Sequence, residues 1–231
     1  MHQPPRRRAI ACLVLSPAGF LQSRSGAEEP GPERWAEDIA EFGEKDRESP
    51  SPPGSILFVG SSSIRRWDLE TSWKDRETIN RGFGGSTIAD AIHYFDPLFS
   101  PHRPRAIILY TGENDINRGS SPATVEDRFR TLTDRIQAQF PAIPVVFLSI
   151  KPSRKRWELW SEMAEANRRI KAICETKPAL FFADTATPML ESVGPDGPSM
   201  DWFVEDELHL SDWGYQCWTA IVETYLESIA K

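Results

Sequence analysis

The sequence is poor in the residues that build metal sites, disulfide frameworks and membrane spans. Only three residues are cysteine, and Cys12, Cys174 and Cys217 form neither a C-x-x-C pair nor a cluster with metal-ligand spacing. No apolar run is long enough to predict a transmembrane segment. The formal net charge of −7 disfavours nucleic acid as the main partner, because phosphate backbones are bound by basic surfaces. The remaining composition is that of an ordinary globular protein, and 231 residues suit one domain with a substantial core.

The N-terminal part divides into two segments. Residues 1–27 combine a basic start, a short apolar stretch interrupted by Ser16-Pro17, and small residues at 25–27, which is the order of a secretory signal peptide. A disordered tail is the alternative, so the location is either exported (periplasmic or extracellular) or cytoplasmic. Residues 28–54 are predicted to hold a Pro/Gly-rich linker and an amphipathic helix over 33–46 that packs on the main domain, 55–231.

Beyond residue 54, short apolar runs alternate with helical periodicity. Strands are predicted at 56–59, 78–81, 106–110, 145–150 and 180–182, and helices at 87–99, 124–140, 157–176 and 211–230. This alternation predicts an α/β fold, a three-layer α/β/α sandwich around a parallel sheet of about five strands in flavodoxin-like order. Ligands of such sheets bind outside the carboxyl ends of the strands.

The first strand runs into the sequence G-S-S-S-I-R-R-W at 60–67. Gly60 permits a sharp turn, and Ser61 to Ser63 can cap the helix that follows. A serine hydroxyl at this edge of the sheet, beside the positive end of a helix, is well placed to act as a nucleophile. The alternative is that the serines are only caps. A nucleotide-binding interpretation fails, because no Gly-Lys-Ser/Thr follows to hold phosphate.

Other strand ends add polar groups to the same edge. Gly85 lies in the turn after the second strand and Asn114 directly after the third, where a backbone N–H and a carboxamide can donate to an oxyanion; both can also be simple turn residues. His209 follows Asp206 by three residues in the connection before the last helix, whereas His93, which follows Asp90 by the same spacing, lies inside a predicted helix. Asp206 can then orient the ring toward a nucleophile, unless the pair is an ordinary helix entry.

With these four motifs in one order, the chain resembles the SGNH hydrolases, the GDSL-type esterase superfamily, particularly the branch near the platelet-activating-factor acetylhydrolases. The resemblance covers roughly residues 55–228 and implies that fold. It implies a triad of Ser62, Asp206 and His209, with an oxyanion hole made by Ser62, Gly85 and Asn114. One departure is Ser61, where the family usually has aspartate.

The expected reaction is hydrolysis of small-acyl, acetyl-like esters without a metal or organic cofactor. The substrate is a small-molecule ester, with an acylated sugar as one candidate. An acyltransferase and a non-catalytic carbohydrate- or lipid-binding module remain alternatives, and the oligomeric state is open. Two features bear on the substrate. Trp67, Trp157 and Trp202 can stack on a sugar or belong to the core, and the basic loop at 151–156 can favour an anion or be a solvated surface.

Overall fold

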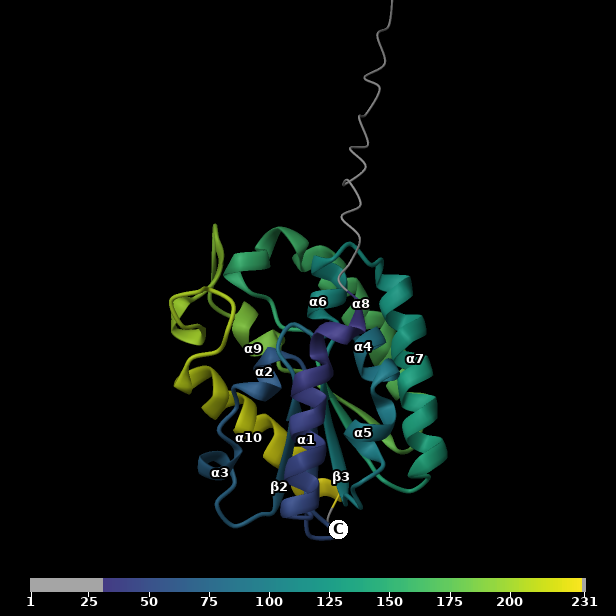
Figure 1. Cartoon of the computed structure of the whole chain (residues 1–231). Helices are drawn as coiled ribbons and strands as arrows, with labels where there is room; N and C mark the ends of the chain where they lie inside the picture. The colour runs from purple at the N-terminus through teal and green to yellow at the C-terminus, as the bar shows by residue number, and fades with distance from the viewer. Residues whose placement is uncertain (1–30, 230–231) are drawn as a thin grey trace, which may run out of the picture. The chain divides into compact units, whose positions relative to one another are not determined.

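The computed structural model describes residues 31–229, so the signal-peptide and tail interpretations of residues 1–27 lie outside the described part and stay predictions. The described residues contain a five-stranded parallel sheet, seen between the labelled helices in Figure 1. Its strands are β1 (Ile56–Gly60), β2 (Thr78–Gly82), β3 (Ala106–Tyr110), β4 (Val145–Leu148) and β5 (Leu180–Ala183). Their order in space is β2-β1-β3-β4-β5, which confirms the flavodoxin-like prediction.

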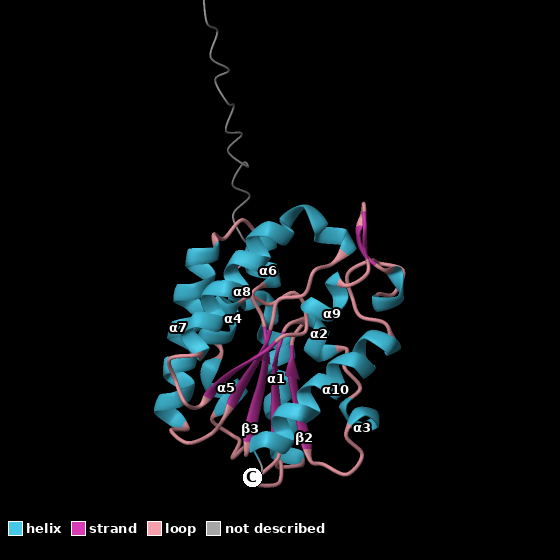
Figure 2. Cartoon of the chain, turned by 180° about the vertical axis from the view of Figure 1, so that it is seen from behind, coloured by secondary structure: helices cyan, strands magenta, loops and turns pink. Residues whose placement is uncertain are grey.

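Helices cover both faces of this sheet (Figure 2). One face packs against α1 (Ala36–Glu48), α4 (Ile88–His93), α5 (Phe95–Phe99), α7 (Pro122–Gln139) and α8 (Trp160–Cys174). The other packs against α2 (Ser62–Arg65), α3 (Leu69–Ser72), α9 (Thr187–Leu190) and α10 (Asp212–Ile229). The structure also has α6 (Glu113–Asn117), a small hairpin of β6 (Val193–Gly194) and β7 (Gly197–Pro198), and the 3-10 helices η1 (Pro32–Trp35), η2 (Arg154–Leu159) and η3 (Met200–Trp202).

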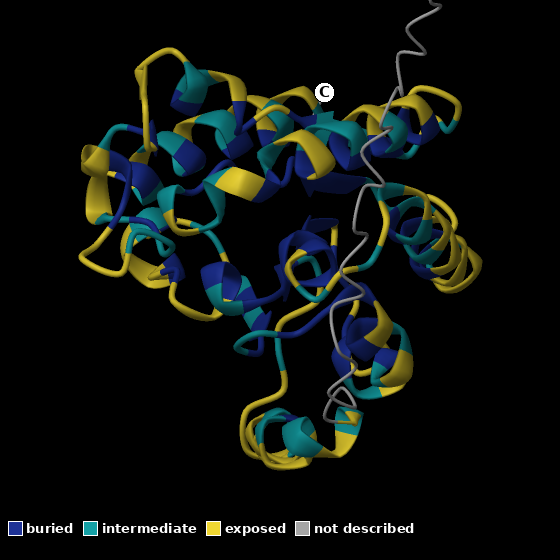
Figure 3. Ribbon diagram, turned by 90° about the horizontal axis from the view of Figure 1, so that it is seen from above, coloured by how far each residue is buried: buried dark blue, intermediate teal, exposed yellow. Residues whose placement is uncertain are grey.

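The sheet is buried on both faces, which explains why its strands are continuous apolar runs (Figure 3). Along β1, Leu57 and Val59 face the core of the first helix layer, whereas Ile56 and Phe58 face the core of the second. Side chains of a strand point alternately to its two faces, so one five-residue strand contributes to both cores.

Two predicted helices differ from the structure in their continuity. The segment predicted as one helix over 87–99 breaks at Tyr94 into α4 and α5. Pro97 explains the break, because it has no N–H to donate to the preceding turn. The helix predicted from residue 157 begins as the 3-10 helix η2 and becomes α-helical only at Trp160, after an irregular backbone at Arg156 (φ −127°, ψ 26°).

The end of β1 lies unusually close to its neighbour β3. A Cβ atom on Gly60 would lie 2.0 Å from the backbone oxygen of Tyr110, and the next N–H, that of Ser61, donates to the same oxygen at 3.2 Å. Only glycine fits this contact, so Gly60 fixes where the chain leaves the sheet toward α2.

A buried ionic network lies just beyond the ends of β3 and β4. The Glu113 carboxylate accepts hydrogen bonds from Lys151 Nζ at 2.6 Å and Tyr110 Oη at 2.7 Å, and Arg156 Nη1 lies 3.2 Å from its other oxygen. Burial raises the pKa of Glu113, but the charges of Lys151 and Arg156 and these hydrogen bonds outweigh it, so the pKa is lowered overall. The basic loop at 151–156, for which a solvated surface was one of two interpretations, therefore begins with a buried lysine.

We expect Gly60→Ala to lower the free energy of unfolding by more than about 2 kcal/mol, because the added methyl group collides with backbone of β3. The matched control is Gly43→Ala in the middle of α1, where nothing lies within 4 Å of the new Cβ atom. That variant should gain about 0.5–1 kcal/mol from helix propensity. Urea denaturation followed by circular dichroism measures both; equal effects of the two substitutions would contradict the steric argument.

Glu113→Gln should lower the free energy of unfolding by about 3–5 kcal/mol at neutral pH, because it leaves the Lys151 ammonium buried without a counter-charge. Because the pKa of Glu113 is lowered in the folded protein, its contribution is full above about pH 4.3 and is lost as the pH falls. The wild-type and variant stabilities should therefore converge in acid. Adding Lys151→Met to the variant should restore part of the loss, and no recovery would contradict the charge argument.

Candidate active site

A cleft of about 590 Å³ lies where the loops after β1, β2 and β3 meet. Its lining consists of Ser62, Arg65, Arg66, Gly84, Gly85, Asn114, Arg156, Leu208 and His209. The sheet register explains this meeting, because Gly60 at the end of β1 pairs with Gly82 of β2 and with Tyr110 of β3. Three loops therefore start at the same level of the sheet.

Ser62, His209 and Asp206 form a hydrogen-bonded series. His209 Nε2 lies 2.9 Å from Ser62 Oγ, and His209 Nδ1 lies 2.5 Å from Asp206 Oδ2. Ser62 is the first residue of α2, and neither it nor Ser61 caps that helix with a side-chain hydrogen bond. The Ser62 hydroxyl is therefore available to the histidine, whereas the sequence left a purely capping role open.

The loop that carries Asp206 and His209 is held in a tight turn. Its ends are joined by an isolated antiparallel β-bridge, a backbone pairing of Phe203 with Leu210. Glu207 within the turn adopts the left-handed conformation at φ 59°. The turn lets Asp206 Oδ1 accept from the backbone N–H groups of Leu208 at 3.0 Å and His209 at 2.8 Å. Burial opposes ionisation, but the hydrogen bonds from the His209 backbone and ring lower the pKa of Asp206 to about 2.

Gly85 and Asn114 line the cleft beside Ser62. Gly85 has a positive φ of 77°, which suits glycine, and its carbonyl accepts from Arg118 Nη2 at 2.7 Å. Asn114 lies in the first turn of α6 and donates one amide hydrogen to the Ser86 carbonyl at 3.0 Å. The second amide hydrogen remains for another acceptor. In the described residues 31–229, the backbone N–H groups of Ser62 and Gly85 donate to no protein acceptor.

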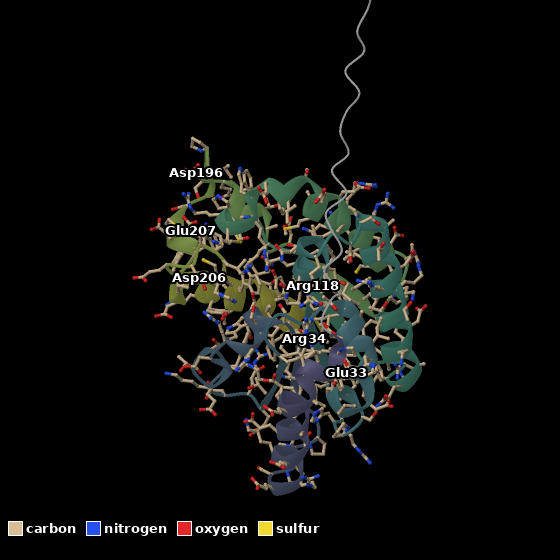
Figure 4. The ribbon with its side chains drawn as sticks, turned by 45° about the horizontal axis from the view of Figure 1, so that its top comes forward. Glu33, Arg34, Arg118, Asp196, Asp206 and Glu207 are labelled. Atoms are coloured by element: carbon tan, nitrogen blue, oxygen red, sulfur yellow. The ribbon has the colours of Figure 1, made fainter. Side chains whose placement is uncertain are left out.

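Support for the Gly85 loop comes from a segment that the sequence assigned only to packing. The Trp35 ring lies 3.5 Å from the position of a Cβ atom on Gly85 and packs edge-on against Phe83. Arg34 and Arg118, which lie close together in Figure 4, both approach the Asp90 carboxylate, at 3.5 and 3.8 Å. The amphipathic pattern of residues 33–46 carried no signal for this contact.

Of the three tryptophans for which the sequence left substrate contact and a core position open, two lie in the core. Trp67 is 3% exposed, within a cluster of aromatic rings from Phe58, Trp73, Tyr215 and Trp218. Trp202 is also buried, in the same core. Trp157 is half-buried against Gly197 and lines a neighbouring cavity rather than the Ser62 cleft. The core interpretation of Trp67 and Trp202 is therefore correct.

Two arginines that were not among the predicted site residues also line the cleft. Arg65 and Arg66 follow Ser62 by three and four residues, a spacing that places side chains on the same side of a helical turn. The signal was present in the G-S-S-S-I-R-R-W sequence itself.

Among residues 31–229, no group of three or more His, Cys, Asp or Glu side chains could hold a metal ion. In the same part of the chain, every helix is too short or too polar to cross a bilayer.

Comparisons with known proteins identify the family of the chain. The model of the GDSL-like Lipase/Acylhydrolase family matches residues 60–217. Among curated proteins, no match was found.

Solved structures share the fold at low sequence identity. A Streptococcus pneumonia protein whose description names platelet activating factor has a TM-score of 0.74 and 18% identity, covering 84% of this chain and 93% of its own. A GDSL-like lipase from Bacteroides thetaiotaomicron has a TM-score of 0.70 and 18% identity, covering 86% and 98%. A family 3 carbohydrate esterase from Clostridium thermocellum has a TM-score of 0.60 and 16% identity, covering 78% and 98%. Because the family model matches more than half of the sequence, the chain belongs to the GDSL-like lipase/acylhydrolase family of SGNH hydrolases.

Proposed function

We propose that the protein is a serine esterase that hydrolyses small-acyl esters, with Ser62 as nucleophile, His209 as general base and acid, and Asp206 as the group that orients His209. One observation carries the proposal: His209 lies within hydrogen-bond distance of both Ser62 Oγ and Asp206 Oδ2. A nucleophile, a base and an orienting carboxylate in series are what acyl transfer requires. Membership of an acylhydrolase family supports the same reaction class.

The reaction proceeds in two steps, acylation of Ser62 and hydrolysis of the acyl-enzyme. Ser62 Oγ attacks the ester carbonyl carbon while its proton passes to His209 Nε2, and the carbonyl oxygen becomes negative. When the C–O bond breaks, His209 returns that proton to the leaving alkoxide, and an acyl-Ser62 ester remains. Water then attacks this ester with His209 again taking a proton, and the carboxylic acid leaves as the Ser62 hydroxyl re-forms. Asp206, ionised because its pKa is about 2, stabilises the positive His209 ring in both steps.

The negative carbonyl oxygen needs donors, and three groups of the cleft can supply them. They are the backbone N–H groups of Ser62 and Gly85, which have no protein acceptor in residues 31–229, and the second amide hydrogen of Asn114. The bond to the Ser86 carbonyl holds the Asn114 amide in place before substrate arrives. Such preorganised donors stabilise charge where it develops in the transition state.

The cleft favours a small acyl group on a polar molecule. Its lining is mostly charged and polar side chains and glycine, with Leu208 as the aliphatic exception. A carbohydrate esterase is among the proteins of the same fold, which supports an acylated sugar as the natural ester. Transfer of the acyl group to a sugar hydroxyl instead of water would use the same groups, and product analysis with an added acceptor separates the two reactions. A binding module without catalysis would not need the Ser62–His209–Asp206 series.

Ser62→Ala and His209→Ala should each lower kcat for p-nitrophenyl acetate by about 10⁴- to 10⁶-fold, because each removes a member of the proton-transfer series. The matched control is Ser61→Ala, since Ser61 immediately precedes the proposed nucleophile and its hydroxyl makes no hydrogen bond within residues 31–229. Ser61→Ala should retain the wild-type rate. Comparable rates for wild type and Ser62→Ala would refute the proposal.

Asn114→Ala should lower kcat by about 10²- to 10³-fold with little change in KM, because the donor acts mainly on the transition state. Asn117→Ala, an exposed asparagine of the same short helix, is the control and should behave as wild type. Steady-state kinetics on p-nitrophenyl acetate give both constants, and circular dichroism verifies folding. A loss confined to KM would mean that Asn114 binds the ground state instead.

A further inference from the structure

Positive charge surrounds the proposed nucleophile, although the protein as a whole carries a net charge of −7. Arg65, Arg66 and Arg156 line the cleft around Ser62, and no carboxylate side chain of the described residues shares that lining. Charge of one sign in a concave site with low-dielectric walls raises the local concentration of ions of the opposite sign. The cleft therefore attracts anions more strongly than the protein's net charge suggests.

Each arginine lies beside a different element of the proposed machinery. Arg65 Nη1 lies 3.1 Å from the position of a Cβ atom on Gly84, next to the Gly85 loop. Arg66 Nη1 lies 3.8 Å from Asp206 Oδ2, and Arg156 Nη1 lies 3.2 Å from Glu113, the neighbour of Asn114. The three guanidinium groups come from two separate segments, residues 65–66 at the end of α2 and the helix η2, and converge on one cleft.

The guanidinium groups keep hydrogen-bonding capacity for a ligand. Within the part of the chain that the structure describes, the carboxylate partners of Arg65 and Arg66 are distant, Asp38 at 3.7 Å and Asp206 at 3.8 Å, and both side chains are more than half exposed. Arg156 shares its partner Glu113 with the buried Lys151. Two positive charges therefore face one negative charge, and the cluster of Arg156, Lys151 and Glu113 keeps one net positive charge. Within residues 31–229, none of the three cleft arginines donates a hydrogen bond with normal geometry to a side chain.

We propose that the ester hydrolysed at Ser62 carries an anionic group of the carboxylate or phosphate class, which Arg65, Arg66 and Arg156 bind. Guanidinium groups suit this role because their planar array of N–H donors matches both oxyanions and stays charged at every working pH. The inference rests on the proposed esterase function and narrows its substrate class. Neutral acetate esters are then accepted substrates of lower kcat/KM.

Matched pairs of esters test the inference. On the alcohol side, p-acetoxybenzoate and p-acetoxyphenyl phosphate are compared with neutral methyl p-acetoxybenzoate. On the acyl side, mono-p-nitrophenyl glutarate is compared with p-nitrophenyl valerate. Each kcat/KM is divided by the rate constant for hydroxide hydrolysis of the same ester, which removes differences in intrinsic reactivity. Comparing the alcohol-side pairs with the acyl-side pair shows on which side of the ester the arginines bind the anion. Comparing the benzoate with the phosphate shows which oxyanion they prefer.

For at least one pair, the normalised anionic-to-neutral ratio should exceed about 10 at low ionic strength and fall as salt is raised toward about 0.5 M. Arg65→Gln should lower that ratio by about 3- to 10-fold, Arg65→Glu should lower it further, and Arg65→Lys should retain most of it. The matched control is Arg105→Gln, an exposed arginine just before β3 at the other end of the strands, which should keep the wild-type ratio.

Normalised ratios at or below one for every pair would overturn the inference. So would ratios that neither Arg65→Gln nor Arg156→Gln changes. In both cases, Ser62-dependent hydrolysis of p-nitrophenyl acetate would still support the esterase proposal. A second readout is independent of turnover. Calorimetric titration of Ser62→Ala with p-hydroxybenzoate should give tighter binding than with its methyl ester, and Arg65→Gln should remove the difference. Anion binding without Ser62-dependent hydrolysis would reject the esterase proposal and leave a site that only binds anions. Equal binding of acid and ester, together with ratios at or below one for every ester pair, would reject the anion site.

Discussion

The candidate site depends on the contact between the end of β1 and the backbone of β3. Gly60 pairs in register with Gly82 on one side and Tyr110 on the other, and its missing side chain lets the Tyr110 oxygen approach. Three chain segments therefore leave the sheet at one level, carrying Ser62, Gly85 and Asn114 after two, three and four residues. Such short loops have little freedom, so the strand register itself sets the spacing of the groups that we propose to bind the oxyanion. Only Asp206 and His209 arrive from a distant, longer loop, which its own bridge and turn hold in place.

The charged groups beneath the cleft extend this constraint into electrostatics. Glu113 is adjacent to Asn114 and holds Lys151 and Arg156 from the segment after β4, so the ends of β3 and β4 are joined by buried charges. A buried ion pair gains little net stability against apolar residues of the same size, because desolvation cancels most of the attraction. What this network does supply is position: it fixes the backbone before Asn114 and presents Arg156 at the cleft. It also leaves an excess of positive charge beside Ser62.

The sequence predicted the strands, their order and the two helix layers because these depend on local periodicity and on general rules of parallel sheets. It also named Ser62 and His209, since few residues of the right chemistry follow the strands. The failures depend on long-range packing. The sequence left substrate contact and a core position open for Trp67, and the ring of Trp218, from a distant position in the chain, helps to bury it. Trp35 beside Gly85 and Lys151 beside Glu113 are likewise pairs that no local pattern encodes. The helical spacing after Ser62, in contrast, could have predicted that Arg65 and Arg66 lie on the same side as the serine.

Arginines beside a nucleophile can act on two different charges, and the distinction decides what they contribute. The oxyanion exists only in the transition state and forms on every ester, so a guanidinium that stabilised it would raise kcat for neutral and anionic substrates alike. A fixed carboxylate or phosphate is present in the ground state as well, so its binding lowers KM and discriminates between substrates. The oxyanion already has three candidate donors in Ser62, Gly85 and Asn114, and the side chains of Arg65 and Arg66 are more than half exposed. Buried, rigid donors stabilise the oxyanion that develops in the transition state. Long, exposed side chains are better suited to binding a carboxylate or phosphate that the substrate already carries. The arrangement therefore favours selection of the substrate as the role of the arginines.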